Sequence, residues 1–247
     1  IMIRKFLEYI DQKSFDPISS FIIKDELNTK IWDGFKMKEN IREDLLKIAN
    51  DFYDSTDLTA EIKDIILTGS LANYNWSERY SDYDLHVVID FKEVGDDFDM
   101  IKKLTGYAKK LWTLEYEIEL EGYEVELYIQ DENEPHTSTG VYSVFNDEWN
   151  VKPNKKTFEP NEKEIKDKAE PIIIMVDDIE DKFDSLSLED LKEKLDKVWD
   201  KIKISRKRGL EEGEFGVGNL VFKLLRRNGY IGKVIDMKRK LYVKQFS

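Results

Sequence analysis

The sequence predicts an α+β fold, in which a mixed β-sheet flanked by helices is followed by an α-helical domain. Residues 65–90 contain two apolar runs separated by a polar connection, a pattern typical of paired strands. Residues 40–52 and 99–114 repeat apolar side chains at three- and four-residue intervals, the period of a helix packed on a core. From residue 161 onward the helical period dominates, with glycines between the candidate helices. A sheet-containing part and a helical part therefore follow each other along the chain.

The N-terminal domain is predicted to cover residues 1–155 and the helical domain residues 156–247. Residues 3–10 have a helical period and are predicted to form an N-terminal helical arm. The stretch after this arm shows no clear period. We expect the aromatic side chains of Trp32 and Phe35 to dock it on the rest of the domain.

The pattern of strand, turn and strand at residues 65–90 contains the main candidate site residues. Its first apolar run ends at Gly69 and Ser70, and its second begins after Asp82 and Asp84. Side chains alternate between the two faces of a strand, so both carboxylates lie on one face while their apolar neighbours enter a core. Two acids held side by side repel each other, and a divalent metal ion is the usual compensation.

A crossover helix at residues 99–114 is expected to lead from this pattern to further strands. Residues 116–129 alternate on both sides of Glu121 and Gly122, which predicts a hairpin. Another strand is expected at residues 141–145. The crossover helix is predicted to turn five side chains toward the core: Ile101, Leu104, Ala108, Leu111 and Trp112.

Four helices are expected in the C-terminal domain. Ser187 followed by Asp190 resembles a capping box, with Asp in place of the usual Glu or Gln. The predicted helical ranges are 161–183, 188–205, 217–228 and 231–244.

The composition restricts the kind of metal site that this chain can build. The 247 residues include no cysteine and two histidines, which excludes disulfides and thiolate zinc sites and disfavours a site built from imidazoles. A metal ion must then be held mainly by oxygen, which favours Mg²⁺ or Mn²⁺. The longest apolar run, residues 172–176, is too short to span a bilayer. We therefore expect a cytoplasmic protein without a membrane partner.

The charge is unevenly distributed along the chain. Residues 201–247 have 13 Lys or Arg against 4 Asp or Glu, a balance of +9, so residues 1–200 carry −22 to give the net charge of −13. A strongly acidic body argues against binding of long DNA. The basic end has two interpretations: solvated faces of terminal helices, or contacts to a nucleotide phosphate or an RNA strand.

The order of these motifs resembles the signature of the polymerase-beta-like nucleotidyltransferases. Gly69 and Ser70 follow an apolar strand, and after eleven intervening residues Asp82 and Asp84 open the next strand. The resemblance covers residues 65–129, and it implies the nucleotidyltransferase palm fold for the N-terminal domain.

The family also has a third acid on a neighbouring strand, between apolar residues. Glu126 lies between Val125 and Leu127 and matches that position. Glu124 shares the same face of the strand by its period and is the alternative. Many family members have Asp where Glu126 stands, and a longer side chain changes the reach to a metal ion.

The resemblance implies a role for each motif. Asp82 and Asp84 would bridge two Mg²⁺ ions, with Mn²⁺ as a substitute, and Glu126 would ligate the ion that activates an attacking hydroxyl. Gly69 and Ser70 would hold the phosphates of a nucleoside triphosphate. The reaction moves a nucleoside monophosphate to a hydroxyl and releases pyrophosphate.

Three further residues are weaker candidates. The helices after a palm commonly contact the nucleotide in this family, so Lys223 and Arg226 are candidates for contacts to the triphosphate or the acceptor. His86 shares the face of Asp82 and Asp84, and it is either a hydrogen-bonded structural histidine or a contact to substrate.

The acceptor stays open between an RNA end, a nucleotide, a protein and a small molecule. The alternative from another class is a catalytically inactive nucleotide-binding or assembly module that retains the palm fold.

Overall fold

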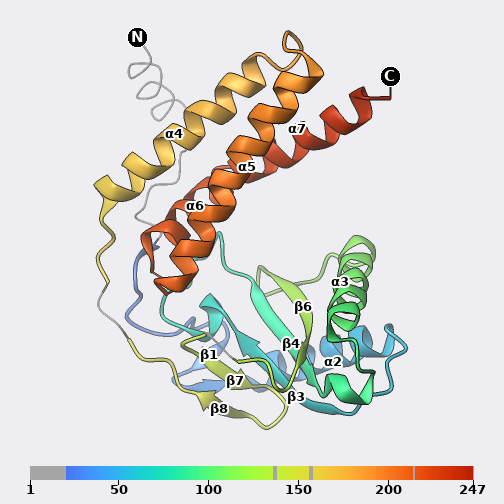
Figure 1. Ribbon diagram of the computed structural model, residues 1–247. Coiled ribbons are helices and arrows are strands. Elements are labelled where there is room, and N and C mark those ends of the chain that lie inside the picture. Colours follow the sequence, from blue (N-terminus) through green and yellow to red (C-terminus); the bar gives the residue numbers. More distant parts are fainter. Residues whose placement is uncertain (1–20, 136–137, 156–157, 214, 247) are drawn as a thin grey trace. The chain divides into compact units, whose positions relative to one another are not determined.

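The computed structural model of the chain divides into two compact units. The sheet unit consists of residues 22–157, and the helical unit consists of residues 158–247 together with Phe21. The predicted helical arm at residues 3–10 lies outside the described residues. The structure describes residues 21–135, 138–155, 158–213 and 215–246 (Figure 1).

The architecture is mixed α/β, as the sequence predicts. The described residues contain six α-helices, a six-stranded mixed sheet and a two-stranded sheet. None of these helices is both long and apolar enough to cross a membrane.

The large sheet has the strand order β5-β6-β4-β3-β7-β8 (Figure 1). The two central strands are β3 and β4, which run antiparallel, and β4 pairs with β6 in parallel. The turn between β5 and β6 has positive φ at Glu121 (54°) and Gly122 (84°), as a tight hairpin with a primed turn requires. The strand bounds are Ile62–Thr68 for β3, Tyr83–Ile89 for β4, Glu119–Leu120 for β5, Tyr123–Asp131 for β6, Val141–Ser143 for β7 and Glu148–Val151 for β8.

The alternation in β4 decides which face of the sheet is core. Tyr83, Leu85 and Val87 are fully buried, whereas Asp84 and His86 on the other face are half-buried. The buried face packs on α2 (Glu39–Asp54) and on residues of the crossover helix α3 (Phe98–Glu115). The face with Asp84 is left for polar side chains, which is where a site can form.

The prediction for the inward residues of α3 is wrong at two positions. Leu104 is 59% exposed and Leu111 is 67% exposed. The residues that face the core are Ile101, Ala108 and Trp112. Apolar residues cover more of this helix than one packing stripe, so the sequence period alone does not choose between two adjacent stripes.

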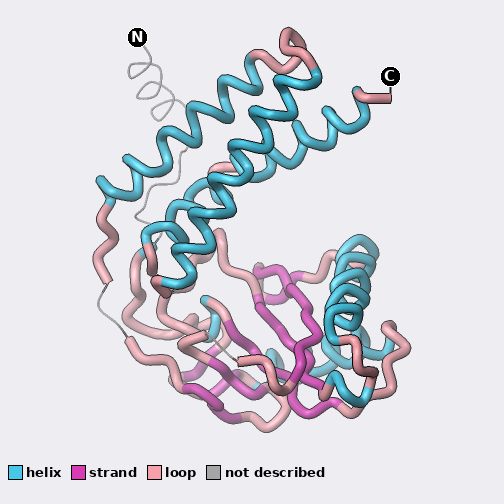
Figure 2. The backbone as a smooth tube through the Cα atoms, in the orientation of Figure 1, coloured by secondary structure: helices cyan, strands magenta, loops and turns pink. Residues whose placement is uncertain are grey.

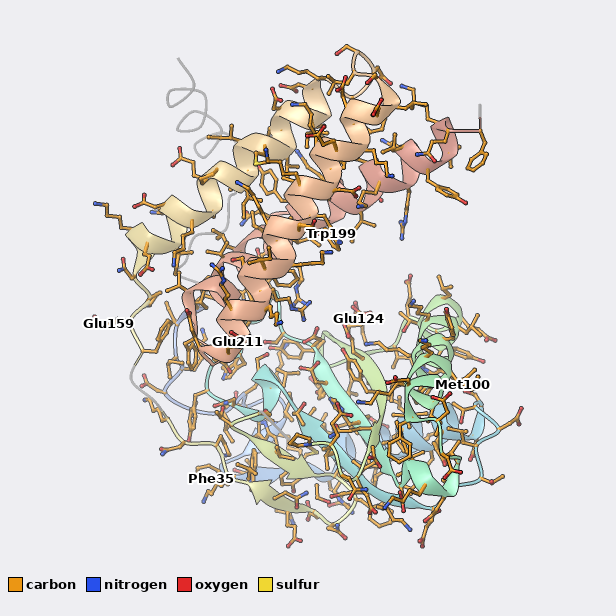
Figure 3. All side chains as sticks on the ribbon, viewed as in Figure 1. Phe35, Met100, Glu124, Glu159, Trp199 and Glu211 are labelled. Carbon is orange, nitrogen blue, oxygen red and sulfur yellow. The ribbon has the colours of Figure 1, made fainter. Side chains whose placement is uncertain are left out.

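A small two-stranded sheet, β1 (Trp32–Asp33) with β2 (Lys36–Met37), fixes the turn after β3. The Trp32 indole is buried and donates from Nε1 to the carbonyl oxygen of Leu71 at 2.8 Å. Leu71 belongs to η2 (Ser70–Ala72), the short 3₁₀-helix that follows Gly69. Phe35 does not dock in the same way, because it is 40% exposed at the surface (Figure 3).

Trp32→Phe is expected to destabilise the sheet unit by about 2 kcal/mol, because the buried Leu71 carbonyl loses its donor. Chemical denaturation of the variant measures this change. The matched control is Trp149→Phe, whose Nε1 donates to the Phe35 carbonyl at 2.7 Å on the exposed side of the same aromatic cluster. Equal losses in the two variants would contradict a special role of the bond to Leu71.

The described residues of the helical unit form four helices (Figure 2). Their buried residues form one core. The apolar faces of the helices form this core, which includes Ile173, Val198, Leu224 and Val234. The predicted cap at Ser187 is confirmed, since the Asp190 amide donates to its hydroxyl at 3.1 Å. The helix bounds are Glu162–Asp181 for α4, Leu188–Glu211 for α5, Val217–Arg227 for α6 and Tyr230–Lys244 for α7.

Candidate metal centre

Three carboxylates converge on the polar face of the sheet. Asp82 precedes β4, Asp84 is its second residue, and Glu126 on β6 is the register partner of Asp84 across the parallel pair. One oxygen of each carboxylate lies within 4.8 Å of the others, and all three side chains are half-buried. Among the described residues this is the only group of three or more potential ligands, and it can hold a metal ion.

Glu124 does not belong to this group. It is exposed near the start of β6 (Figure 3), where its register partner is Glu119 on β5. The strand period puts Glu124 and Glu126 on one face, but only Glu126 is opposite Asp84.

Two neighbours hold the Glu126 carboxylate in place. Lys109 on α3 donates from Nζ to Glu126 Oε2 at 2.8 Å, and the Tyr128 hydroxyl donates to the same oxygen at 2.5 Å. Lys109 and Glu126 are about one-quarter and one-third exposed, so their ion pair is partly shielded from water. Both donors restrain the rotamer of Glu126 before any ligand arrives.

Tyr128 is itself fixed by stacking. Its ring lies 4.7 Å from the His86 ring at an interplanar angle of 18°, and Lys109 Nζ is 3.4 Å from the ring centroid on Tyr128. Burial raises the pKa of Tyr128 above 10.0, and the hydrogen bond to Glu126 with the nearby carboxylate charges raises that pKa further. The phenol therefore keeps its proton at neutral pH and remains a donor to Glu126.

Tyr128→Phe is expected to weaken divalent-ion binding about tenfold, because outer partners of a ligand commonly contribute that much. Titration of the protein with Mn²⁺ measures the affinity. The control is Tyr142→Phe, which removes another tyrosine–carboxylate bond, from Tyr142 to Asp147 at 2.5 Å. An unchanged affinity in Tyr128→Phe would show that the hydroxyl does not position Glu126.

Gly69 lies against the carboxylates and has no room for a side chain. Its φ of 73° and ψ of −158° are accessible almost only to glycine. A Cβ at this position would lie 1.8 Å from Asp84 Oδ2. The backbone of Gly69 therefore lies too close to Asp84 to admit any side chain.

Ser70 begins η2 directly beside this contact. Its hydroxyl is 2.7 Å from that of Ser81, which also accepts from the Ser77 amide at 2.8 Å. These bonds fold the connection between β3 and β4 back toward Asp82. The structure thus brings five of the predicted site residues, from three stretches of chain, into one region of the sheet unit: Gly69, Ser70, Asp82, Asp84 and Glu126.

Lys223 and Arg226 lie on α6 in the helical unit. Arg226 is exposed and Lys223 is half-buried. A role for either residue at the carboxylates stays a prediction.

His86 is a member of the site face. Its Nε2 is 3.4 Å from the Thr68 hydroxyl, and its ring packs on Tyr128. The residues that sequence reasoning missed are Lys109 and Tyr128. The signal for Tyr128 was its period-two relation to Glu126, whereas Lys109 is separated from Glu126 by the whole turn into β6.

The chain matches no family model, no curated protein and no solved structure.

Proposed function

We propose that this chain is a metal-dependent nucleotidyltransferase with a polymerase-beta-like palm, which transfers a nucleoside monophosphate from a triphosphate to a hydroxyl and releases pyrophosphate. The observation that carries the proposal is the group of Asp82, Asp84 and Glu126, with their ligand atoms within 4.8 Å, beside the bare backbone of Gly69. Three carboxylates within 4.8 Å repel one another, and a bound divalent ion would offset that repulsion.

The donor set fits hard divalent ions. Carboxylate oxygens without thiolates or imidazoles are the ligands that Mg²⁺ and Mn²⁺ prefer. Asp82, Asp84 and Glu126 would hold two such ions, which when bound neutralise the negative charge that develops during phosphoryl transfer.

The residues of the chain have separate tasks in this proposal. Gly69 lets the backbone turn tightly beside Asp84, and the Ser70 hydroxyl next to it would donate to phosphate oxygens. Glu126, held by Lys109 and Tyr128, lies on the side of the acceptor hydroxyl and takes up its proton or orients it.

The proposal is tested with the full chain, Mg²⁺, labelled triphosphates and a cell extract. We expect Mg²⁺-dependent pyrophosphate release, and mass analysis of the labelled products identifies the class of acceptor. Calorimetry with each triphosphate distinguishes the alternative: metal-dependent binding without turnover on any acceptor would indicate an inactive nucleotide-binding module. Absence of both binding and turnover would refute the assignment.

A further inference from the structure

A cavity of about 420 Å³ opens on the same face of the sheet, and its lining includes Lys109 and Tyr128, the two donors to Glu126. It begins at His86 and Tyr128, which are the next residues on this face after Asp84 and Glu126. The helix α3 forms its second wall, and Glu134, Pro135 and Ser138 contribute its rim. Its volume lies in the range of small-molecule sites. The lining includes Thr68, Thr105, Gly106, Gln130, Glu134 and Ser138.

Gly106 is the unusual residue of this cavity. It lies in the interior of α3, where glycine costs about 1 kcal/mol relative to alanine. A Cβ on Gly106 would meet no heavy atom within 4 Å, so close packing does not require glycine here. A larger side chain at Gly106 would reduce the volume of the cavity.

Lys102, Lys109 and Glu134, which line the cavity, each have a partner of opposite charge. Lys102 lies 3.3 Å from Glu134, and Lys109 lies 2.8 Å from Glu126. These pairs cancel most of the charge that the cavity presents. A ligand therefore meets mainly hydrogen-bonding groups, and a compound with a strong net charge gains little.

Gln130 supplies a directional group at the base of the cavity. Its side chain is 8% exposed, and its Nε2 makes one long hydrogen bond of 3.5 Å to the Glu134 carbonyl oxygen. The amide thus retains capacity to donate and accept. Thr68 and Ser138 also line the cavity; the Ser138 hydroxyl donates to the Gly140 carbonyl oxygen at 2.9 Å and can still accept a hydrogen bond.

From these contacts we infer that the cavity binds a small, neutral, polyhydroxylated molecule of sugar or nucleoside size. This step rests on the proposed function: the molecule is the acceptor, since Lys109 and Tyr128, which donate to Glu126, line the cavity. The charge of the sheet unit supports a small acceptor over a nucleic acid end: residues 22–157 have 30 Asp or Glu against 16 Lys or Arg.

Binding is measured directly on the full chain labelled with ¹⁵N-glycine, which gives one amide signal for each of 12 glycines. The probes are glucose, adenosine, ribose 5-phosphate, kanamycin and a short RNA. We expect glucose or adenosine to shift the Gly106 signal in a saturable way while the Gly232 signal stays unchanged. Shifts only with the charged probes or with RNA, or with none of the five, would overturn the inference.

Gly106→Leu tests the cavity, with Gly232→Leu as its matched control. Both glycines lie in helices, and a Cβ on either meets no heavy atom within 4 Å. We expect Gly106→Leu to weaken neutral-probe binding at least about tenfold, measured by ligand-observed saturation transfer, and Gly232→Leu to leave it unchanged. Equal affinity in both variants would contradict a ligand in this cavity.

Two further measurements separate this inference from the proposed function. Neutral-probe binding is expected to persist in the Asp82→Asn, Asp84→Asn double variant, even if the chemistry assigned to these residues is wrong. ATP with Mg²⁺ is expected to leave the probe bound; displacement of the probe by ATP would assign the cavity to the donor nucleotide and overturn its role for an acceptor.

Discussion

Asp84→Asn is expected to lower Mg²⁺-dependent pyrophosphate release about 10³-fold, which corresponds to about 4 kcal/mol of lost transition-state stabilisation. Asp84 is the carboxylate directly opposite Glu126, and it also contacts the Gly69 backbone, so it touches both halves of the proposed site. Steady-state pyrophosphate release with and without Mg²⁺ measures the effect. An activity within tenfold of the unchanged protein would remove Asp84 from the proposed chemistry.

Glu124→Gln is the matched control for Asp84→Asn. It removes the same charge from the same face of the sheet, but at an exposed position outside the carboxylate group. We expect its activity to be unchanged within about twofold. A comparable loss in Glu124→Gln would point to the general negative charge of this face rather than to metal ligation.

The thermal stability of Asp84→Asn without metal ions is an independent test of the carboxylate group. Two carboxylates with oxygens within 4.8 Å of each other repel by about 1 kcal/mol in water. Asp84→Asn is then expected to raise the Tm by about 2–4 °C in EDTA and to lose the further stabilisation by Mg²⁺. A lower Tm in EDTA would mean that the Asp84 carboxylate is structurally required.

Gly69→Ala is expected to destabilise the sheet unit by about 3 kcal/mol and to abolish metal-dependent triphosphate binding. The φ of 73° with ψ of −158° disfavours any side chain, and the new Cβ would fall 1.8 Å from Asp84 Oδ2. Relief of this clash must move Asp84 or the turn. Chemical denaturation gives the stability change, and calorimetry with ATP and Mg²⁺ gives the binding.

Gly34→Ala separates the cost of a side chain at positive φ from the cost of the clash with Asp84. Gly34 also has a positive φ, 59°, but a Cβ there would meet no atom within 4 Å. The variant is expected to cost only about 1 kcal/mol and to bind ATP normally. If Gly69→Ala cost no more than Gly34→Ala, the contact with Asp84 would not be limiting.

The sequence predicted most elements because their periods are strong. The helix α2, expected at residues 40–52, spans Glu39–Asp54, and the hairpin around Glu121 and Gly122 forms with the expected turn. The strands β1, β2 and β8 were not predicted. Each has two to four residues, too few for a period to show, and each forms because neighbouring chain supplies hydrogen bonds.

The carboxylate group was predictable for a different reason. Asp82 and Asp84 share a face by the strand period, and Glu126 was preferred over Glu124 on its apolar neighbours. The register that pairs Asp84 with Glu126 depends on how the crossover helix returns the chain, which no local pattern encodes. The contact of Lys109 with Glu126 depends on the same return, so the sequence did not reveal it.

The parallel pairing of β4 with β6 also fixes when the carboxylate group can form during synthesis. Asp82 and Asp84 leave the ribosome well before Glu126, because the whole of α3 is translated between them. At about 5–20 residues per second the stretch from Asp84 to Glu126 takes seconds to synthesise. The closest approach of the three charges is thus delayed until β6 adds to the sheet. Lys109, the ion-pair partner of Glu126, is already synthesised when this third carboxylate joins the group.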